Sequence, residues 1–179
     1  MGDLRRLPSL LDADYRCLYS GRSETDAEQR RRALVRFITN PSLHAVVLIR
    51  LALLGPPSLT HLWRHVLLAK HSIDLERGCQ IGPGLNLPHP FGILFGGGAR
   101  IGTNVHLYHN VTLGTLGSDG TTPESGPVID KGAIIHTNTM IASGAVIGAG
   151  ATIGANSFVD GVVPPGAVFA RGQIVQRGA

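Results

Sequence analysis

Aromatic residues, charged residues and cysteine are all scarce in this 179-residue chain. Aromatic residues account for only 5% of it, which argues against an ordinary core built around large rings. The two cysteines, Cys17 and Cys79, lie far apart and outside any CxxC motif, so neither a disulfide framework nor a cysteine-ligated zinc site is expected. Glycine is plentiful instead, with 24 residues, and favours an architecture of small side chains and tight turns.

Long apolar runs and basic stripes are missing as well. The start of the chain lacks the apolar core of a signal peptide, and the most apolar run, residues 43–54, contains His44 and Arg50. That run is too short and too charged to cross a bilayer, so we expect a soluble, cytoplasmic protein without a membrane span. The formal charge is +4, but no basic stripe interleaved with aromatics indicates nucleic-acid binding.

The periodicity of the chain changes near residue 72. Residues 1–72 have a helical pattern and are predicted as an α-helical N-terminal region, with helices near residues 8–20, 27–38, 42–54 and 59–70. Ser23 and Asp26 resemble a capping box, Pro41 opens the third helix, and Ser58 is expected to cap the fourth. Residues 73–170 are predicted as a separate repeat region with a loop at 114–127, followed by a tail at 171–179.

A six-residue period fills the repeat region. The leader of each hexad is apolar, the residue after it is often Gly or Asp, and the residue four after it is small or β-branched. Each hexad is expected to form a short strand and a corner, with the leader in a narrow core and glycine supplying the corner's backbone angles. Because one hexad cannot bury its own leader, the coils must stack. The leaders are Leu75, Ile81, Leu87, Phe95, Ile101, Leu107, Leu113, Ile129, Ile135, Ile141, Ile147, Ile153 and Val159.

The period breaks in two places. The spacing between Leu87 and Phe95 is eight residues, and the spacing between Leu113 and Ile129 is sixteen. In a regular solenoid such departures mark loops that leave the wall, and binding sites are often built from loops on a rigid scaffold.

Several stretches of the repeat region then point to a family. From about residue 40, the motifs LPHPFGI, FGGGARIG, VTLG and VVPPGAVFARGQIV resemble the serine acetyltransferase branch of the left-handed β-helix (hexapeptide-repeat) acyltransferases. The chain resembles the truncated polysaccharide-type members more than true serine acetyltransferases. The resemblance implies a mainly β fold, a left-handed parallel β-helix behind a short helical region. It also implies acetyl-CoA as cofactor, no metal, and a homotrimer, with a hexamer as the alternative.

The family transfers acetyl to a hydroxyl with a histidine base, and His89 occupies the matching place between two prolines. His109 follows its leader as His89 does, one coil later, and is predicted to project beside it as a second catalytic residue. His106 and His136 are expected on the surface. His44, His61, His65 and His71 are expected to be structural.

The acceptor site departs from the family pattern by loss of charge. Gly126 stands in place of the second histidine, Ser125 in place of an arginine, Pro88 in place of an aspartate, and Asn40 in place of another aspartate. Since a zwitterionic amino acid needs both a cation and an anion, we predict a sugar or other small neutral hydroxyl as acceptor. Serine O-acetylation is the alternative. Pro88, Asp119 and Ser125 are the predicted substrate-binding residues.

The acyl donor is expected along the later coils and the tail. The donor is acetyl-CoA or, alternatively, the pantetheine of a carrier protein. Backbone amides of Gly96, Gly97 or Gly114 are candidates for the oxyanion hole. The predicted cofactor-binding residues are Gly114, Ala142, Ser143, Gly148, Arg171 and Arg177.

Two other classes of protein stay open at this point. One is a non-catalytic trimeric β-helix that has lost activity together with its second histidine. The other is an interface-metal protein of the carbonic anhydrase type, for which His89, His106 and His109 supply the ligands.

Overall fold

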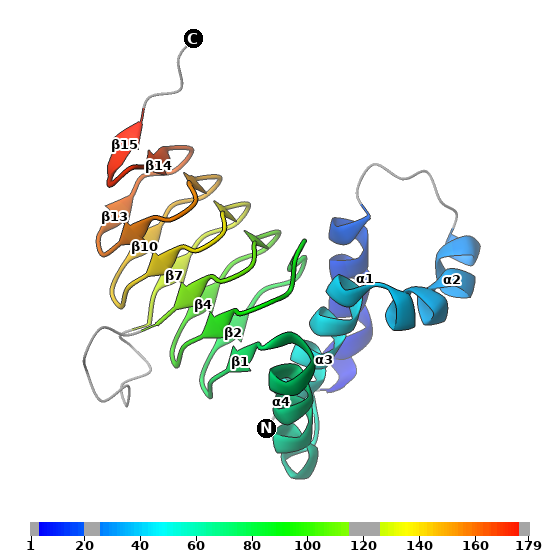
Figure 1. Ribbon diagram of the computed structural model, residues 1–179. Helices are drawn as coiled ribbons and strands as arrows, with labels where there is room; N and C mark the ends of the chain where they lie inside the picture. The colour runs from blue at the N-terminus through cyan, green and yellow to red at the C-terminus, as the bar shows by residue number, and fades with distance from the viewer. Residues whose placement is uncertain (1–3, 20–25, 115–125, 176–179) are drawn as a thin grey trace.

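A computed structural model describes residues 4–19, 26–114 and 126–175 of the chain. A short 3₁₀-helix, Leu4–Arg6, precedes four α-helices, and a column of short strands follows them. The helices gather at the end of the column where β1 (Asp74–Leu75) and β2 (Gln80–Ile81) lie, and β15 (Gln173–Val175) lies at the opposite end (Figure 1). The helices are α1 (Leu7–Leu18), α2 (Asp26–Thr39), α3 (Pro41–Leu54) and α4 (Pro57–His71).

Proline and asparagine set the helix starts. Pro41 opens α3 as predicted, and the Asn40 side chain caps it by accepting hydrogen bonds from the backbone N–H groups of Ser42 and Leu43. The predicted cap of α4 is wrong. That helix begins at Pro57 with Pro56 as its N-cap and no side-chain cap, because proline already has the backbone angle of a first helical residue. Ser23 lies outside the described residues.

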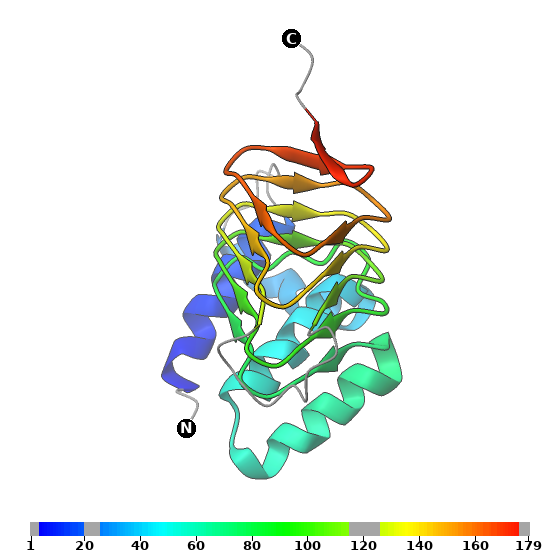
Figure 2. The ribbon, with the colours of Figure 1, turned by 90° about the vertical axis from the view of Figure 1, so that its left-hand side faces the viewer.

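The strands form three sheets around a column, with parallel pairing throughout except for the last two strands of the chain, which confirms the predicted parallel β-helix. The sheet orders are β1-β3-β6-β9-β12, β13-β10-β7-β4-β2 and β15-β14-β11-β8-β5. Figure 2 shows the stacked coils rising from the helices to the C-terminal end. The strands are β1 (Asp74–Leu75), β2 (Gln80–Ile81), β3 (Leu94–Phe95), β4 (Arg100–Ile101), β5 (His106–Leu107), β6 (Thr112–Leu113), β7 (Val128–Ile129), β8 (Ile134–Ile135), β9 (Met140–Ile141), β10 (Val146–Ile147), β11 (Thr152–Ile153), β12 (Phe158–Val159), β13 (Val162–Val163), β14 (Val168–Ala170) and β15 (Gln173–Val175).

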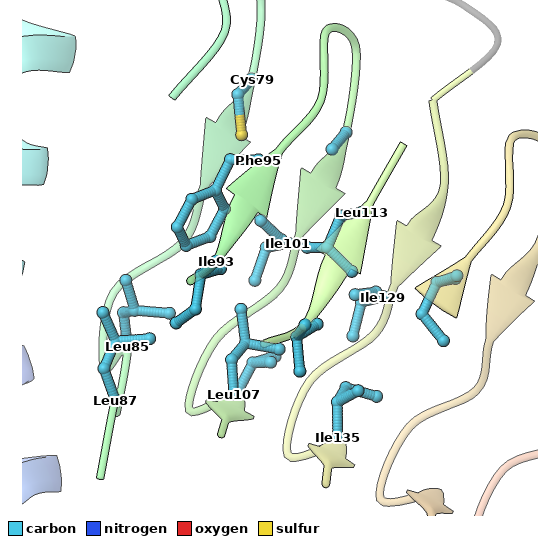
Figure 3. Packing of buried hydrophobic residues seen from close by; sticks show 14 of the residues in the cluster. Cys79, Leu85, Leu87, Ile93, Phe95, Ile101, Leu107, Leu113, Ile129 and Ile135 are labelled. Atoms are coloured by element: carbon cyan, nitrogen blue, oxygen red, sulfur yellow. The ribbon is translucent and has the colours of Figure 1, made fainter. Parts of the chain in front are cut away.

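The hexad leaders form the core. All of them are buried except Ile81, which is half-buried against the same cluster. Their side chains point between the strands toward one another, as the labelled residues of Figure 3 show. Each fully buried Leu, Ile or Phe side chain contributes about 1.5–3 kcal/mol relative to an exposed one. The small residues at the fifth place of each hexad, such as Ala99 and Ala133, are buried beside them.

The glycines after the leaders do not supply the corner's backbone angles, contrary to the sequence prediction. Positive φ occurs two residues later in the hexad, as at Gly84 (φ 78°) and Asn104 (φ 54°). Gly82 instead allows adjacent coils to approach, since a Cβ there would lie 2.7 Å from the carbonyl oxygen of Gly102. Gly96 does the same against Leu113, at 2.3 Å. Close approach, not turn geometry, therefore selects glycine at this place.

The column ends in a hairpin. β15 pairs antiparallel with β14, and Arg171 and Gly172 between them both have positive φ. Such a two-residue turn matches the twist of the flanking strands. The predicted tail thus begins with this turn and continues as a strand that extends the third sheet.

Candidate active site

The eight-residue spacing between Leu87 and Phe95 produces a loop at the helical end of the column. Asn86 bridges His106 in parallel register, and the next strand pairing begins only at Leu94. Between them the side chain of His89 is exposed, while Pro88 is half-buried and Pro90 is buried. The loop therefore presents an imidazole on a backbone that is anchored on both sides.

The structure brings His89 and His109 together. Their ring centroids lie 5.9 Å apart, with the ring planes at 77°. The parallel register of Asn86 with His106 explains this, because it aligns the residues that follow on adjacent coils. The Nδ1 atom of His109 is buried and has no hydrogen-bond partner in the described part of the chain.

The other two histidines of this edge do not lie free on the surface. His136 stacks on Tyr108 at 5.0 Å between ring centroids, and Tyr108 in turn lies 6.3 Å from His89. His106 faces α1, where the Cys17 Sγ lies 3.8 Å from its Nε2, and burial lowers the pKa of His106. The sequence pattern did not predict that α1 covers His106, because a local pattern does not indicate where a helix docks.

The residues proposed for a metal are divided between two environments. His89 and His109 share the loop side of the edge, whereas His106 lies beneath α1. Across residues 4–19, 26–114 and 126–175, no group of three His, Cys, Asp or Glu side chains within one chain is placed to hold a metal ion.

Neither cysteine is suited to act as a nucleophile. Burial, aided by Glu76, raises the pKa of the Cys79 thiol to about 12. Burial and the charge of Asp14 also raise the pKa of Cys17. Both thiols are therefore protonated near neutral pH, and the thiolate is the reactive form.

A cavity of about 520 Å³ opens beside His89. It lies between the loop and the junction of α2 with α3, so the helical region forms half of its wall. Among the described residues of this wall none is acidic, and the cation is Arg36. The lining residues are Tyr19, Arg36, Thr39, Asn40, Pro41, Ser42, Pro88, His89, Pro90 and Phe91.

Arg36 is a site residue that the sequence analysis did not find. Its guanidinium carbon lies 4.4 Å from the Tyr19 ring centroid, and its Nη1 donates a hydrogen bond to the Tyr15 hydroxyl. Stacking on tyrosine holds a guanidinium in one orientation. In the sequence, Arg36 is one of several arginines on a predicted polar helix face, and only its place four residues before the Asn40 cap distinguishes it.

Asn40 lines the same cavity, but its side chain is engaged. Its Oδ1 caps α3, and its Nδ2 donates to the Tyr19 hydroxyl at 2.7 Å. The polar groups of the junction are thus held in fixed positions around the cavity.

Gly126 has no room for a side chain. It is buried, and a Cβ there would lie 2.2 Å from the carbonyl carbon of Gly98. A histidine therefore cannot occupy this place without movement of the backbone, so its absence is built into this fold.

The amides predicted for an oxyanion hole are already engaged. The N–H of Gly96 donates to Leu113, and the N–H of Gly114 donates to Ile141, as ladder bonds between coils. The N–H of Gly97 donates to the Glu76 carboxylate at 2.5 Å. All three N–H groups therefore already have acceptors in this structure, and their role as oxyanion donors stays a prediction.

The predicted donor-binding residues fall into separate places. Gly114 and Ala142 stack at one edge of the column, and the Ser143 Oγ beside them is buried without a hydrogen-bond partner among the described residues. Gly148 lies after β10 in a different sheet, with Pro165 against it. Arg171 is exposed at the hairpin turn. Asp119, Ser125 and Arg177 lie outside the described residues.

The six-residue period of the coils is typical of hexapeptide-repeat proteins, and comparison with known sequences agrees. Residues 126–161 match the family model described as bacterial transferase hexapeptide (six repeats). A curated serine acetyltransferase of Synechocystis sp. is 32% identical over 113 residues, which cover 61% of this chain and 43% of the relative. The chain thus spans less than half the length of that relative.

Solved structures similar to this chain are also serine acetyltransferases. A serine acetyltransferase from Neisseria gonorrhoeae matches with a TM-score of 0.78 and 27% identity, over 97% of this chain and 67% of that one. A soybean serine acetyltransferase complexed with serine matches with the same TM-score and identity, over 96% and 70%. The chain is similar to serine acetyltransferases in sequence and in fold, which agrees with the resemblance of its motifs.

The helices carry no membrane segment in the part of the chain that the structure describes: none is both long enough and apolar enough to span a bilayer.

Proposed function

We propose that the protein is an acetyl-CoA-dependent O-acetyltransferase in which His89 is the general base. The observation that carries this proposal is the exposed His89 imidazole at the wall of a 520 Å³ cavity, on the loop where the solenoid departs from its period. The similarity to serine acetyltransferases supports the reaction class.

The chemistry needs one proton acceptor at the hydroxyl. Neutral imidazole removes the hydroxyl proton as the oxygen attacks the thioester carbonyl carbon. The carbon–sulfur bond then breaks, the acetyl group stays on the acceptor oxygen, and the CoA sulfur leaves with a proton. His109, 5.9 Å from His89 between ring centroids, is proposed as the second histidine that supports this transfer.

The comparisons change the preferred acceptor from the one that the sequence predicts. Loss of charge at Pro88, Ser125 and Gly126 predicts a neutral hydroxyl, whereas the similar soybean structure is complexed with serine. Arg36 supplies a cation in the cavity, which removes part of the argument against a carboxylate. We therefore place L-serine first among the candidate acceptors and a sugar hydroxyl second.

For the donor, we propose that acetyl-CoA uses the edge with Gly114, Ala142 and Ser143. The Ser143 Oγ supports this, because it is buried without a partner among the described residues, which is costly unless a ligand satisfies it.

Release of the CoA thiol from acetyl-CoA, measured with L-serine, L-serinamide and neutral sugars, tests the proposal. His89→Asn is expected to lower kcat by roughly 10²-fold or more while the protein stays folded. Arg36→Gln is expected to raise KM about tenfold for L-serine but not for serinamide or a sugar, since one charged hydrogen bond contributes about 1.5 kcal/mol. Arg31→Gln, at an exposed position of α2, is the control.

Each part of the proposal is contradicted by a different result. No thiol release with any acceptor would favour a non-catalytic trimer, and stoichiometric zinc in elemental analysis would favour the interface-metal class. An unchanged kcat in His89→Asn would remove His89 from the mechanism. Equal use of serine and serinamide by the unmodified protein would remove Arg36 from acceptor recognition.

A further inference from the structure

We propose that Ser42 and His71 are positioning residues that hold the His89 loop from the helical side, with His44 fixing the orientation of His71. The proposal rests on the function proposed above for His89, but its structural part can be tested without activity.

The loop cannot be fixed by strand pairing. Pro88 and Pro90 have no backbone N–H to donate, so only carbonyl groups are available on either side of His89. The His89 carbonyl accepts from the N–H of Phe91 at 2.9 Å, and the Phe91 carbonyl accepts from the N–H of Asn110 at 2.8 Å. The carbonyls of the two prolines remain, and both are turned toward the helical region.

Ser42 holds the first of them. Its hydroxyl donates to the Pro88 carbonyl at 3.3 Å, and its side chain is 8% exposed. Ser42 lies in the first turn of α3, where the Asn40 side chain accepts a hydrogen bond from its N–H at 2.9 Å. The donor is therefore fixed by the helix cap.

His71 faces the second carbonyl. It is the last residue of α4, is 5% exposed, and its own carbonyl accepts from the N–H of Gly92 at 3.2 Å. The His71 ring lies 6.2 Å from that of Phe91, the residue after Pro90, between ring centroids. Burial lowers the pKa of His71, and the nearby Pro90 carbonyl opposes this effect. His71 Nδ1 is buried and has no hydrogen-bond partner among the described residues.

His44 completes the arrangement. Its Nδ1 lies 2.8 Å from the Nε2 of His71. If His71 Nδ1–H points at the Pro90 carbonyl, Nε2 is left as the acceptor and His44 must donate from Nδ1. Burial first, and then neighbouring charge including Lys70, lowers the pKa of both rings, so both are neutral near pH 7.

The helical region thus sets the geometry of the loop in addition to covering the first coil. α3 holds Pro88 through the Ser42 hydroxyl, and α4 holds the end of the loop through the bond between the His71 carbonyl and the N–H of Gly92. Catalysis is sensitive to such support, because displacement of a reacting group by about 1 Å can cost up to 10²-fold in rate.

Steady-state kinetics separate positioning from simple structural support. His71→Leu is expected to lower kcat about tenfold, with the KM values for acetyl-CoA and acceptor within about twofold. His71→Asn keeps an N–H donor near the Nδ1 position and should recover most of kcat. Ser42→Ala should lower kcat about threefold. His65→Leu, at an exposed position of the same helix, is the matched control.

NMR of ¹³C-labelled histidine gives a readout that needs no turnover. The His89 ring signal, assigned with His89→Asn, should be single in the unmodified protein and broadened or multiplied in His71→Leu and Ser42→Ala. Restoration of a single signal in His71→Asn would support the proposal.

An unperturbed His89 signal and unchanged kcat in folded His71→Leu and Ser42→Ala would overturn it, as would an equal loss in His65→Leu. If the unmodified protein lacks activity, the function of His89 fails while the NMR result still decides the positioning.

Discussion

Gly126 illustrates how a single residue constrains this site. The carbonyl carbon of Gly98 would lie 2.2 Å from a Cβ at this position, and the atoms in the way are backbone, which cannot rotate aside. The missing second histidine is therefore coupled to the close packing of the coils. A sequence comparison alone records the loss of charge but not the lack of space.

Gly126→Ala is accordingly expected to destabilise the protein by about 1–3 kcal/mol through overpacking. Thermal or denaturant unfolding measures this change. Gly161→Ala is the control, because no atom lies within 4 Å of a Cβ there and its φ is not positive. Equal stability of the two variants would contradict the packing seen around Gly126.

At the scale of elements, one buried ion pair attaches α1 to the column. Asp14, which is 0% exposed, accepts two hydrogen bonds from Arg50 of α3 and further bonds from the N–H groups of Gly84 and Leu85. Arg50 also donates to the carbonyls of Ile81 and Gly82. Two helices and the first coil therefore meet at a single charge pair.

Asp14→Asn leaves the Arg50 guanidinium buried without its counter-charge, which is expected to cost about 3–5 kcal/mol. Amide hydrogen exchange should show loss of protection in α1 and in residues 81–85. Asp12→Asn breaks only an exposed pair with Arg16 and should change stability by roughly 0.5 kcal/mol or less. Retained protection of α1 in Asp14→Asn would argue against this docking role.

At the scale of the whole molecule, the single chain leaves apolar strand residues uncovered. Phe158 and Val162 are 46% and 70% exposed on the outside of the column. Such uncovered apolar side chains favour association of chains.

We expect a homotrimer, with a mass in solution of about three times the 18.9 kDa of one chain. Light scattering coupled to size exclusion measures this mass directly at micromolar concentration. A hexamer would show that the helical region also pairs trimers, and a monomer would contradict the assembly.

The sequence by itself determined the coils and the place of the irregular loop. Each hexad has the same local pattern, an inward apolar leader with a small residue four places later. The register of His89 with His109 can therefore be predicted by counting positions from the leaders of adjacent coils. The same counting located the departure within residues 88–94, where the candidate base lies.

Only the tertiary structure decided which groups surround that base. Arg36 lines the cavity, and Asn40 caps α3. His106 packs beneath α1. The N–H groups of Gly96 and Gly114 donate to neighbouring coils. These outcomes depend on how the helices fold across the first coil, through contacts such as Asp14 with Gly84, which are 70 residues apart. A local repeat specifies the column, whereas the docking of non-repeating helices depends on long-range packing and buried charge that no local pattern encodes.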